Sequence, residues 1–147
     1  MRSIISCLLL VLAVGCGSAT ARTAGRVSQA HLTGDRITLD DTIRFEHDSA
    51  VIVEESQQLI ADIAAVLAEH TELRVVHVVG HTDASGDDAH NLQLSEARAQ
   101  AVVDALRERG VTIQLDARGA GETEPVCTED TDECHARNRR VEIIVES

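Results

Sequence analysis

One short segment, residues 73–80, constrains the fold more than any other part of the chain. It reads Leu-Arg-Val-Val-His-Val-Val-Gly and is rich in β-branched, apolar residues. Such near-continuous apolar runs are typical of strands that lie in the middle of a sheet and are covered on both faces. The segment therefore predicts the central strand of a packed domain.

Two predicted helices flank this strand. Residues 54–70 and 92–109 repeat apolar side chains at helical spacing, and Gly110 ends the second helix. Residues 36–45 alternate as a strand does, with a break at Asp40 and Asp41. Residues 114–119 and 141–145 are predicted to be strands, and the segment between them to be mostly loop. The order β-α-β-α-β-β, with a parallel strand-helix-strand crossover, predicts one α+β sandwich with helices packed on one face of a mixed sheet.

The amino terminus is typical of a targeting segment. An apolar run over residues 4–14 is too short to span a bilayer and suits a secretory signal. Residues 12–16, Leu-Ala-Val-Gly-Cys, resemble a bacterial lipobox, which predicts a signal peptide over residues 1–15 and lipidation of Cys16. The alternative is ordinary cleavage after Ala21, which would give a soluble periplasmic protein.

The residues after Cys16 predict how the domain is attached. Gly17 follows where lipoproteins of the inner membrane often carry Asp, so we expect an outer-membrane lipoprotein facing the periplasm. Residues 16–35 mix small and polar residues without strong periodicity and are predicted to be a tether. The alternative is an extension packed on the domain, which we place at residues 36–147.

Charge and aromatic content exclude several kinds of partner. The formal net charge is −12, so nucleic acid and anionic lipid surfaces are disfavoured. Phe45 is the only aromatic residue of the 147, and it cannot provide the stacking platform that single-stranded nucleic acid requires. Any anionic ligand must be bound by a local cluster of basic residues.

Five motifs then occur in order: residues 43–49 (Ile-Arg-Phe-Glu-His-Asp-Ser), 79–83 (Val-Gly-His-Thr-Asp), 91–102 (Asn-Leu-Gln-Leu-Ser-Glu-Ala-Arg-Ala-Gln-Ala-Val), 119–122 (Gly-Ala-Gly-Glu) and 138–142 (Asn-Arg-Arg-Val-Glu). Together they resemble the OmpA-like domain of peptidoglycan-associated lipoproteins and OmpA porins. The resemblance implies noncovalent binding of peptidoglycan through the diaminopimelate of its peptide stem. It also implies anchoring of the outer membrane to the cell wall, with no cofactor and no enzymatic activity.

The side-chain end of diaminopimelate carries one ammonium and one carboxylate. Asp83 is suited to the ammonium and Arg98 to the carboxylate, and both match the ligand-binding pair of the family. Each charge-assisted bond contributes about 1.5–3 kcal/mol. Arg98 has no acidic neighbour three or four residues away and is expected near the helix start, where a cation is disfavoured. The alternatives are an Arg98 that is solvated or paired with a distant carboxylate, and an Asp83 that caps its own loop.

The resemblance adds further candidates for peptidoglycan contact: Thr82, Asn91, Leu94, Ser95, Asp48, Phe45 and Arg139. Asn91 is equally suited to be a helix N-cap, and Phe45 to be plain core. His47 replaces the apolar or aromatic residue usual in the family. That change weakens the expectation of a Tol-Pal type protein partner.

Cys127 and Cys134 lie seven positions apart in an acidic segment. In an oxidising periplasm they are expected to form a disulfide, as in some OmpA-like domains. Two free thiols or a zinc site with His135 are the alternatives. His77, His81 and Asp83 suggest a metal-dependent cell-wall hydrolase. However, His77 lies within the strand, on the side of Val75 and Val79, whereas His81 and Asp83 follow the strand's end, so we expect no metal. A third possibility is the wall-anchoring subunit of a larger envelope complex.

Overall fold

The computed structural model describes residues 27–147, and its sheet is built around β3 (Val75–His81). Val76 and Val78 are fully buried, as the β-branched segment predicts. β3 pairs in parallel with β4 (Gln114–Gly121) and antiparallel with β5 (Val141–Glu146). The five-stranded sheet has the order β1-β2-β5-β3-β4, which confirms a mixed sheet.

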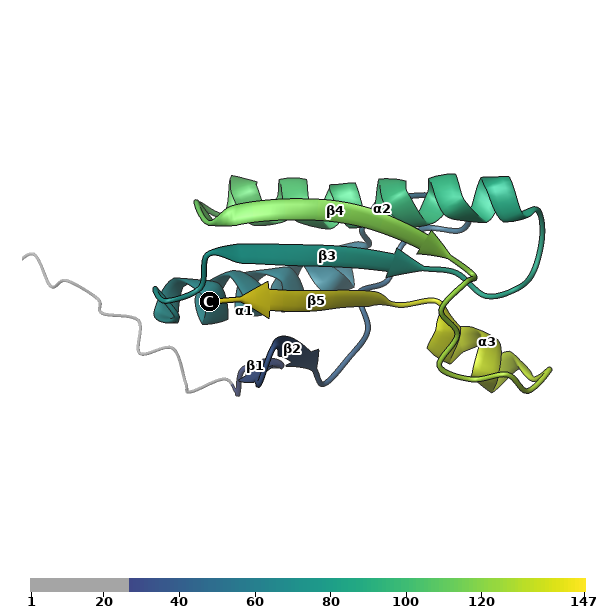
Figure 1. Cartoon of the computed structure of the whole chain (residues 1–147), viewed down its shortest axis with the longest axis horizontal. Coiled ribbons are helices and arrows are strands. Elements are labelled where there is room, and N and C mark those ends of the chain that lie inside the picture. Colours follow the sequence, from purple (N-terminus) through teal and green to yellow (C-terminus); the bar gives the residue numbers. More distant parts are fainter. Residues whose placement is uncertain (1–26) are drawn as a thin grey trace, which may run out of the picture.

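Two helices lie on one face of this sheet (Figure 1). A short 3-10 turn, Glu54–Ser56, leads into α1 (Gln57–Glu69), which buries the periodic apolar residues of the sequence. α2 (Asp88–Glu108) connects β3 to the parallel strand β4. The core between helices and sheet is aliphatic, and its fully buried members include Ile60, Ile63 and Leu106.

α2 lies very close to the sheet where two strands carry glycine. A Cβ atom added at Gly80 would lie 2.1 Å from the backbone oxygen of Ser95, and one added at Gly119 would lie 2.7 Å from the backbone oxygen of Leu92. No side chain fits between helix and sheet there. The two glycines therefore set the distance at which α2 packs on β3 and β4.

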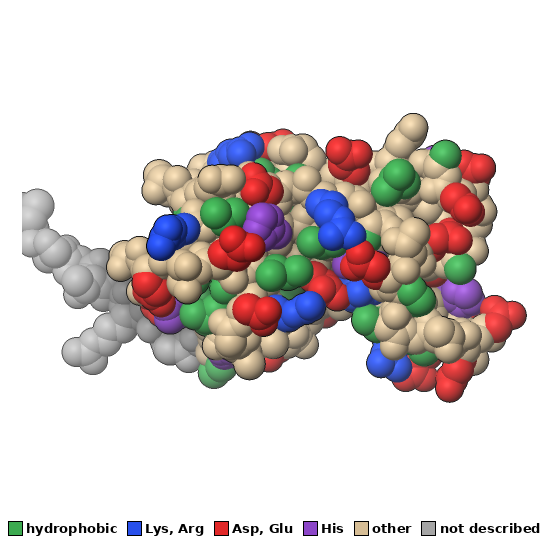
Figure 2. Space-filling view, viewed as in Figure 1, with side chains coloured by type: hydrophobic (Ala, Val, Ile, Leu, Met, Phe, Trp, Pro, Cys, Tyr) green, Lys and Arg blue, Asp and Glu red, His purple; other side chains and the backbone are tan. Residues whose placement is uncertain are grey.

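The opposite face of the sheet carries charged side chains (Figure 2). On it His77 lies 3.5 Å from Asp116 and 3.3 Å from Glu146. Acidic and basic groups are interspersed, so this face is suited to solvent. Within residues 27–147, none of the helices combines the length and apolar character needed to cross a bilayer.

The amino-terminal part of the domain differs from the expectation. β1 (Ala30–Thr33) and β2 (Arg36–Leu39) form an antiparallel hairpin at the edge of the sheet. The tether predicted over residues 16–35 therefore ends earlier than expected, because Ala30 begins β1 and is buried against the core. The signal peptide, Cys16 and the tether up to residue 26 lie outside the described residues.

Two other boundaries are corrected. The strand predicted over residues 36–45 ends at Leu39, and Phe45 makes only an isolated bridge with Ile52. The segment between β4 and β5 contains a short helix, α3 (Asp132–Asn138), which was predicted to be loop. The added elements make the order β-β-α-β-α-β-α-β, while the α+β class with helices on one sheet face is confirmed.

Candidate functional site

The chain remains buried where it leaves β3, although its residues become polar. His81, Thr82 and Asp83 are 2, 5 and 6% exposed. Buried polar groups require partners, because they have given up contact with water. Asp83 has such partners, whereas the ring nitrogens of His81 and the hydroxyl of Thr82 have no hydrogen-bond partner among residues 27–147. This end of β3 therefore combines paired and unpaired buried polar groups.

Asp83 is fixed by contacts on both carboxylate oxygens. Oδ1 accepts hydrogen bonds from the backbone N–H of Ser85, at 3.0 Å, and from its hydroxyl. Oδ2 accepts from Nη1 of Arg139 at 2.5 Å. Burial alone would raise the pKa of Asp83, but the bonds from Ser85 and Arg139 outweigh it and lower the pKa below its ordinary value. Asp83 is therefore an anion at neutral pH.

Arg98 extends from α2 toward the loop before α1. Its Nε donates to the backbone oxygen of Ser49 at 2.9 Å, and its guanidinium lies 5.2 Å from the ring centre of Phe45. Burial and the nearby charge of Arg139 lower the pKa of Arg98, opposed by Asp48. An anion beside Arg98 would relieve this unfavourable environment.

One expectation about Arg98 is wrong. α2 begins at Asp88 rather than at residue 92, because Asp87 caps the helix by accepting from the backbone N–H of His90 at 3.0 Å. Arg98 thus lies in the middle of the 21-residue helix, away from the terminus where the macrodipole acts. Asn91 is inside the helix and is not its N-cap.

Asp83, Arg98 and Arg139 border a common cleft of about 570 Å³. The two arginines and the aspartate therefore face one space rather than separate surfaces. The rest of the lining comes from His47, Asp48, Thr82, Ser85, Gly86, His90, Asn91 and Leu94.

The outer wall of the cleft contains a contact between the loop before α1 and the first turn of α2. Nε2 of His90 lies 2.8 Å from Oδ1 of Asp48. This contact with His90 lowers the pKa of Asp48. Asp48 has a positive φ of 47°, a conformation that Asp tolerates better than most residues. Sequence reasoning identified Asp48 but missed His90, because their contact spans 42 positions.

Asn91 and Ser95 support the cleft from beneath. The Asn91 side-chain amide donates to the backbone oxygen of Ser85 at 2.9 Å and to Glu122 at 2.8 Å. Ser95 is fully buried, and its hydroxyl accepts from the backbone N–H of Gly121 at 2.9 Å. Asn91 reaches the cleft, but Ser95 does not border it, so the structure places Ser95 away from any ligand there.

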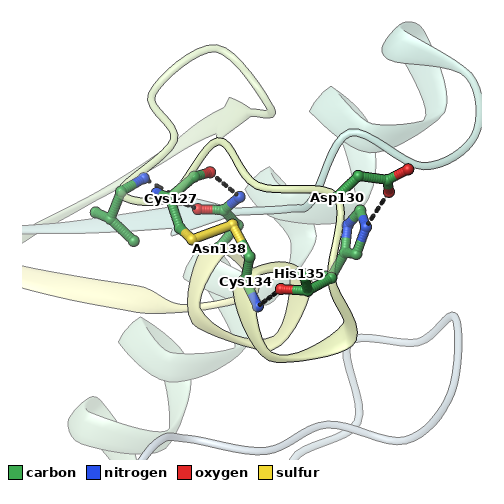
Figure 3. Close-up of a disulfide and its surroundings, with 7 residues drawn as sticks. Cys127, Asp130, Cys134, His135 and Asn138 are labelled. Atoms are coloured by element: carbon green, nitrogen blue, oxygen red, sulfur yellow. Dashed lines mark hydrogen bonds and ion pairs between the residues drawn. A yellow bond between two sulfur atoms is a disulfide. The ribbon is translucent and has the colours of Figure 1, made fainter.

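The segment around α3, which directly precedes Arg139, is held together by a disulfide and by hydrogen bonds of Asn138 (Figure 3). The predicted disulfide between Cys127 and Cys134 is present, with Cα atoms 5.4 Å apart. The side-chain oxygen of Asn138 accepts from the N–H groups of Val126 and Cys127 at 3.0 and 3.1 Å, and its amide donates to the Cys127 oxygen at 2.8 Å. These bonds fix the residue that precedes Arg139.

Phe45 lies outside the cleft and borders a smaller hollow next to it, together with Arg98 and Arg139. The three residues that suggest a metal site in the sequence are separated in the structure. His77 belongs to the open face of the sheet, whereas His81 is buried and Asp83 faces the cleft. No group of three or more metal-ligating side chains capable of holding an ion occurs among residues 27–147.

Residues that sequence reasoning missed in the cleft include Ser85 and Gly86. The spacing Asp83-x-Ser85 is that of an Asx turn, so a turn search could have identified Ser85. The pairing of Asp83 with Arg139 joins residues 56 positions apart and left no local signal.

Comparison with known proteins identifies relatives of this domain. The model of the OmpA family matches residues 44–139. The chain is 34% identical over 114 residues to the probable lipoprotein YiaD of Escherichia coli, covering 76% of this chain and 52% of the relative. It is 40% identical to outer membrane porin F of Pseudomonas aeruginosa, covering 76% of this chain and 32% of the porin. The chain thus spans between about a third and half of these curated relatives.

Solved structures agree with the fold. The peptidoglycan-associated lipoprotein of Burkholderia pseudomallei has a TM-score of 0.64 at 30% identity, covering 71% of this chain and 89% of that structure. The cell wall anchor of the T6SS from Pseudomonas aeruginosa has a TM-score of 0.66 at 36% identity, covering 80% and 86%.

Proposed function

The chain belongs to the OmpA family, and on that premise we propose that its domain binds peptidoglycan noncovalently and does not cleave it. The observation that carries the proposal is the cleft in which buried Asp83 faces the same space as Arg98 and Arg139. Two solved relatives are a peptidoglycan-associated lipoprotein and a cell wall anchor, which supports the same ligand here.

The chemistry of the cleft suits the diaminopimelate of the peptide stem. Its side-chain ammonium would bind to Asp83, whose low pKa keeps it charged. Its carboxylate would bind to Arg98, whose guanidinium is half-buried and has no carboxylate partner among the described residues. Arg139 would then be shared between Asp83 and the ligand. Such a set of charge-assisted bonds is sufficient for an affinity near micromolar, about −8 kcal/mol.

The remaining walls would contribute shape and secondary contacts. Thr82, Asn91, Leu94 and Asp48 border the cleft and are proposed to contact the peptide. Phe45 would act through Arg98, since its ring lies against that guanidinium.

The proposed location is the periplasmic side of the outer membrane. A lipid on Cys16 would anchor the chain there, and a tether ending before β1 would connect it to the domain. Envelope proteins of the Tol type belong to this proposal as partners. Mass spectrometry of the mature amino terminus tests it, because acylated Cys16 supports the anchor and a free Arg22 contradicts it.

Co-sedimentation with purified sacculi tests the cleft. The double variant Asp83→Ala, Arg98→Ala is expected to lose at least about 100-fold in affinity, because both charge-assisted contacts are removed. The matched control is Asp104→Ala, Arg107→Ala, which removes the same charges from an exposed ion pair on α2. The control should bind as wild type does. Undiminished binding of the first double variant would refute the cleft, and fragments released from the sacculi would refute binding without cleavage.

Sacculi in which lysine replaces diaminopimelate test the ligand itself. Lysine has the ammonium but not the carboxylate, so Arg98 would lose its partner. Binding should weaken by about tenfold or more, given the strength of an arginine–carboxylate contact. Equal binding to both wall types would show that the cleft recognises some other group.

A further inference from the structure

A second hollow, of about 330 Å³, lies next to the cleft and shares Arg98 and Arg139 with it. It is formed where the loop after β2 meets the end of β3 and the junction of α3 with β5. Its lining consists of Thr42, Ile43, Arg44, Phe45, His81, Arg98, Ala136, Arg139 and Arg140. We call this space the arginine hollow.

The arginine hollow is bordered by four arginine residues and by no acidic residue. Two of the four are neutralised from outside it, since Arg139 pairs with Asp83 and Arg140 pairs with Glu142 at 2.7 Å. Arg98 donates only to a backbone oxygen, and the Arg44 side chain has no partner among residues 27–147. In a chain of net charge −12, this is a local excess of positive charge.

His81 provides a second, independent sign of a ligand. Its side chain is 1% exposed and borders the arginine hollow, yet neither ring nitrogen has a hydrogen-bond partner in the described part of the protein. The nearest carboxylate oxygen, on Glu142, is 3.9 Å away. A buried ring with two unsatisfied nitrogens is unusual and indicates a missing partner.

We propose that the arginine hollow is a carboxylate-binding subsite, in which Arg44 and Arg98 bind the carboxylate and His81 donates an N–H to it. A planar carboxylate matches the fork of a guanidinium, and its single charge suits the two free arginines. The subsite shares Arg98 with the cleft, but it is argued from Arg44, the unpaired His81 ring and the charge of the hollow, and so does not rest on the proposed function.

The charged groups around His81 agree with this assignment. Burial and then Arg140 lower the pKa of His81, while Glu142 and Glu124 act in the opposite direction and Arg118 adds to the lowering. A bound anion would add a negative charge at the ring and raise the pKa of His81. The ring is therefore a direct reporter of occupancy.

The experiment is a titration of the full chain with sodium acetate, followed by NMR of the His81 ring. Sodium chloride at equal ionic strength is the reference. We expect saturable shifts of the His81 signals with acetate and none with chloride. Arg44→Gln, which changes an exposed residue, should weaken acetate binding by about fivefold or more. Arg74→Gln removes the same charge at the other end of β3 and should bind acetate as wild type does.

The absence of a saturable His81 shift would overturn the proposal, as would equal acetate binding by wild type and Arg44→Gln. A second titration distinguishes the source of the carboxylate. If a soluble tripeptide containing D-glutamate and diaminopimelate shifts His81 and displaces acetate, the wall peptide supplies the carboxylate. If acetate binds but the tripeptide does not bind at all, the carboxylate subsite is supported and the proposed binding of peptidoglycan is refuted.

Discussion

The two ends of β3 are built differently, although both open onto a hollow. At the amino-terminal end, a hollow of about 660 Å³ lies between the ends of α1 and α2 and the start of β4. At the carboxyl-terminal end, the cleft is smaller, at about 570 Å³. Size alone would therefore select the end of the strand opposite to the proposed site.

Buried polar groups distinguish the two ends. All the buried polar side chains of residues 27–147 except Ser56 gather at the carboxyl-terminal end: His81, Thr82, Asp83, Asn91, Ser95 and Asn138. None of them borders the larger hollow. Burying polar groups costs stability unless each is paired, so their concentration at one end indicates function.

The close packing of α2 on β3 is the feature whose loss should cost most. Gly80→Ala would place a Cβ atom 2.1 Å from the Ser95 backbone oxygen, so the helix must move away. We expect the free energy of unfolding to fall by about 3 kcal/mol, at the upper end of overpacking effects. Chemical denaturation with urea measures it.

Gly110→Ala is the matched control at the other end of α2. No atom lies within 4 Å of the added Cβ, but the backbone φ of +83° disfavours alanine. The free energy of unfolding should fall by about 1–2 kcal/mol, from the disfavoured backbone conformation alone. A Gly80→Ala protein as stable as the Gly110→Ala protein would contradict the claim that packing is tighter at the cleft end.

Asn138 sharpens the comparison by testing a buried polar group away from the ligand. Asn138→Ala removes three hydrogen bonds to the backbone of Val126 and Cys127. We expect a loss of about 2 kcal/mol, because three hydrogen bonds of a buried side chain are removed together. Sacculus binding should weaken too, since Arg139 follows directly.

Gln100→Ala is the control for Asn138→Ala. It removes one exposed contact to Asp104 on α2, at 2.8 Å. Thermal unfolding should show a change within about 0.5 kcal/mol. Equal losses from the two variants would mean that burial does not distinguish these amide side chains.

Because His81 is buried at the cleft end of β3, the stability of the folded protein should depend on pH. The pKa of His81 is lowered in the folded protein from an ordinary value of 6.5, so the unfolded chain binds a proton first as pH falls. Stability should therefore decline as pH falls below 6.5, with a slope of at most about 1.4 kcal/mol per pH unit. Urea unfolding at several pH values between about 7 and 5 measures the slope.

His81→Gln removes this titration and should flatten the profile. Asp83 does not interfere with this test. Its pKa is lowered in the folded protein, so its contribution to stability is lost only as pH falls below its ordinary pKa of 3.8. An unchanged slope in His81→Gln would show that the ring is not held neutral by burial.

The sequence predicted those elements that have strong periodicity. The β-branched segment forms β3, and the apolar repeat over residues 54–70 forms α1 together with the short 3-10 turn before it. α3 was missed because Asp-Glu-Cys-His-Ala-Arg-Asn has no apolar stripe, and only Cys134 and Asn138 are buried. The first turn of α2 was missed for the same reason, because Asp88, His90 and Asn91 are polar and Ala89 alone makes no apolar stripe.

The site was predictable only as a set of residues, not as a geometry. The motifs named Asp83, Arg98 and Arg139, and the structure brings the three to one cleft. The bond between Asp83 and Arg139 depends on how β5 and α3 dock beside β3, which no local pattern encodes. Ser95 illustrates the converse, because a residue within a binding motif is fully buried under the strands.

The smallest effect is expected from an ion pair that lies exposed on the surface. Arg118 and Glu124 pair with side chains 61 and 48% exposed. A double-mutant cycle with Arg118→Ala and Glu124→Ala should give a coupling below about 0.5 kcal/mol, which about 0.5 M salt should screen further. The same cycle for Asp83 and Arg139 should give more than about 1 kcal/mol, because the Asp83 side chain is only 8% exposed. If the two couplings were equal, charge alone would account for both pairs, and the burial that separates the cleft end of β3 from the other would have no energetic meaning.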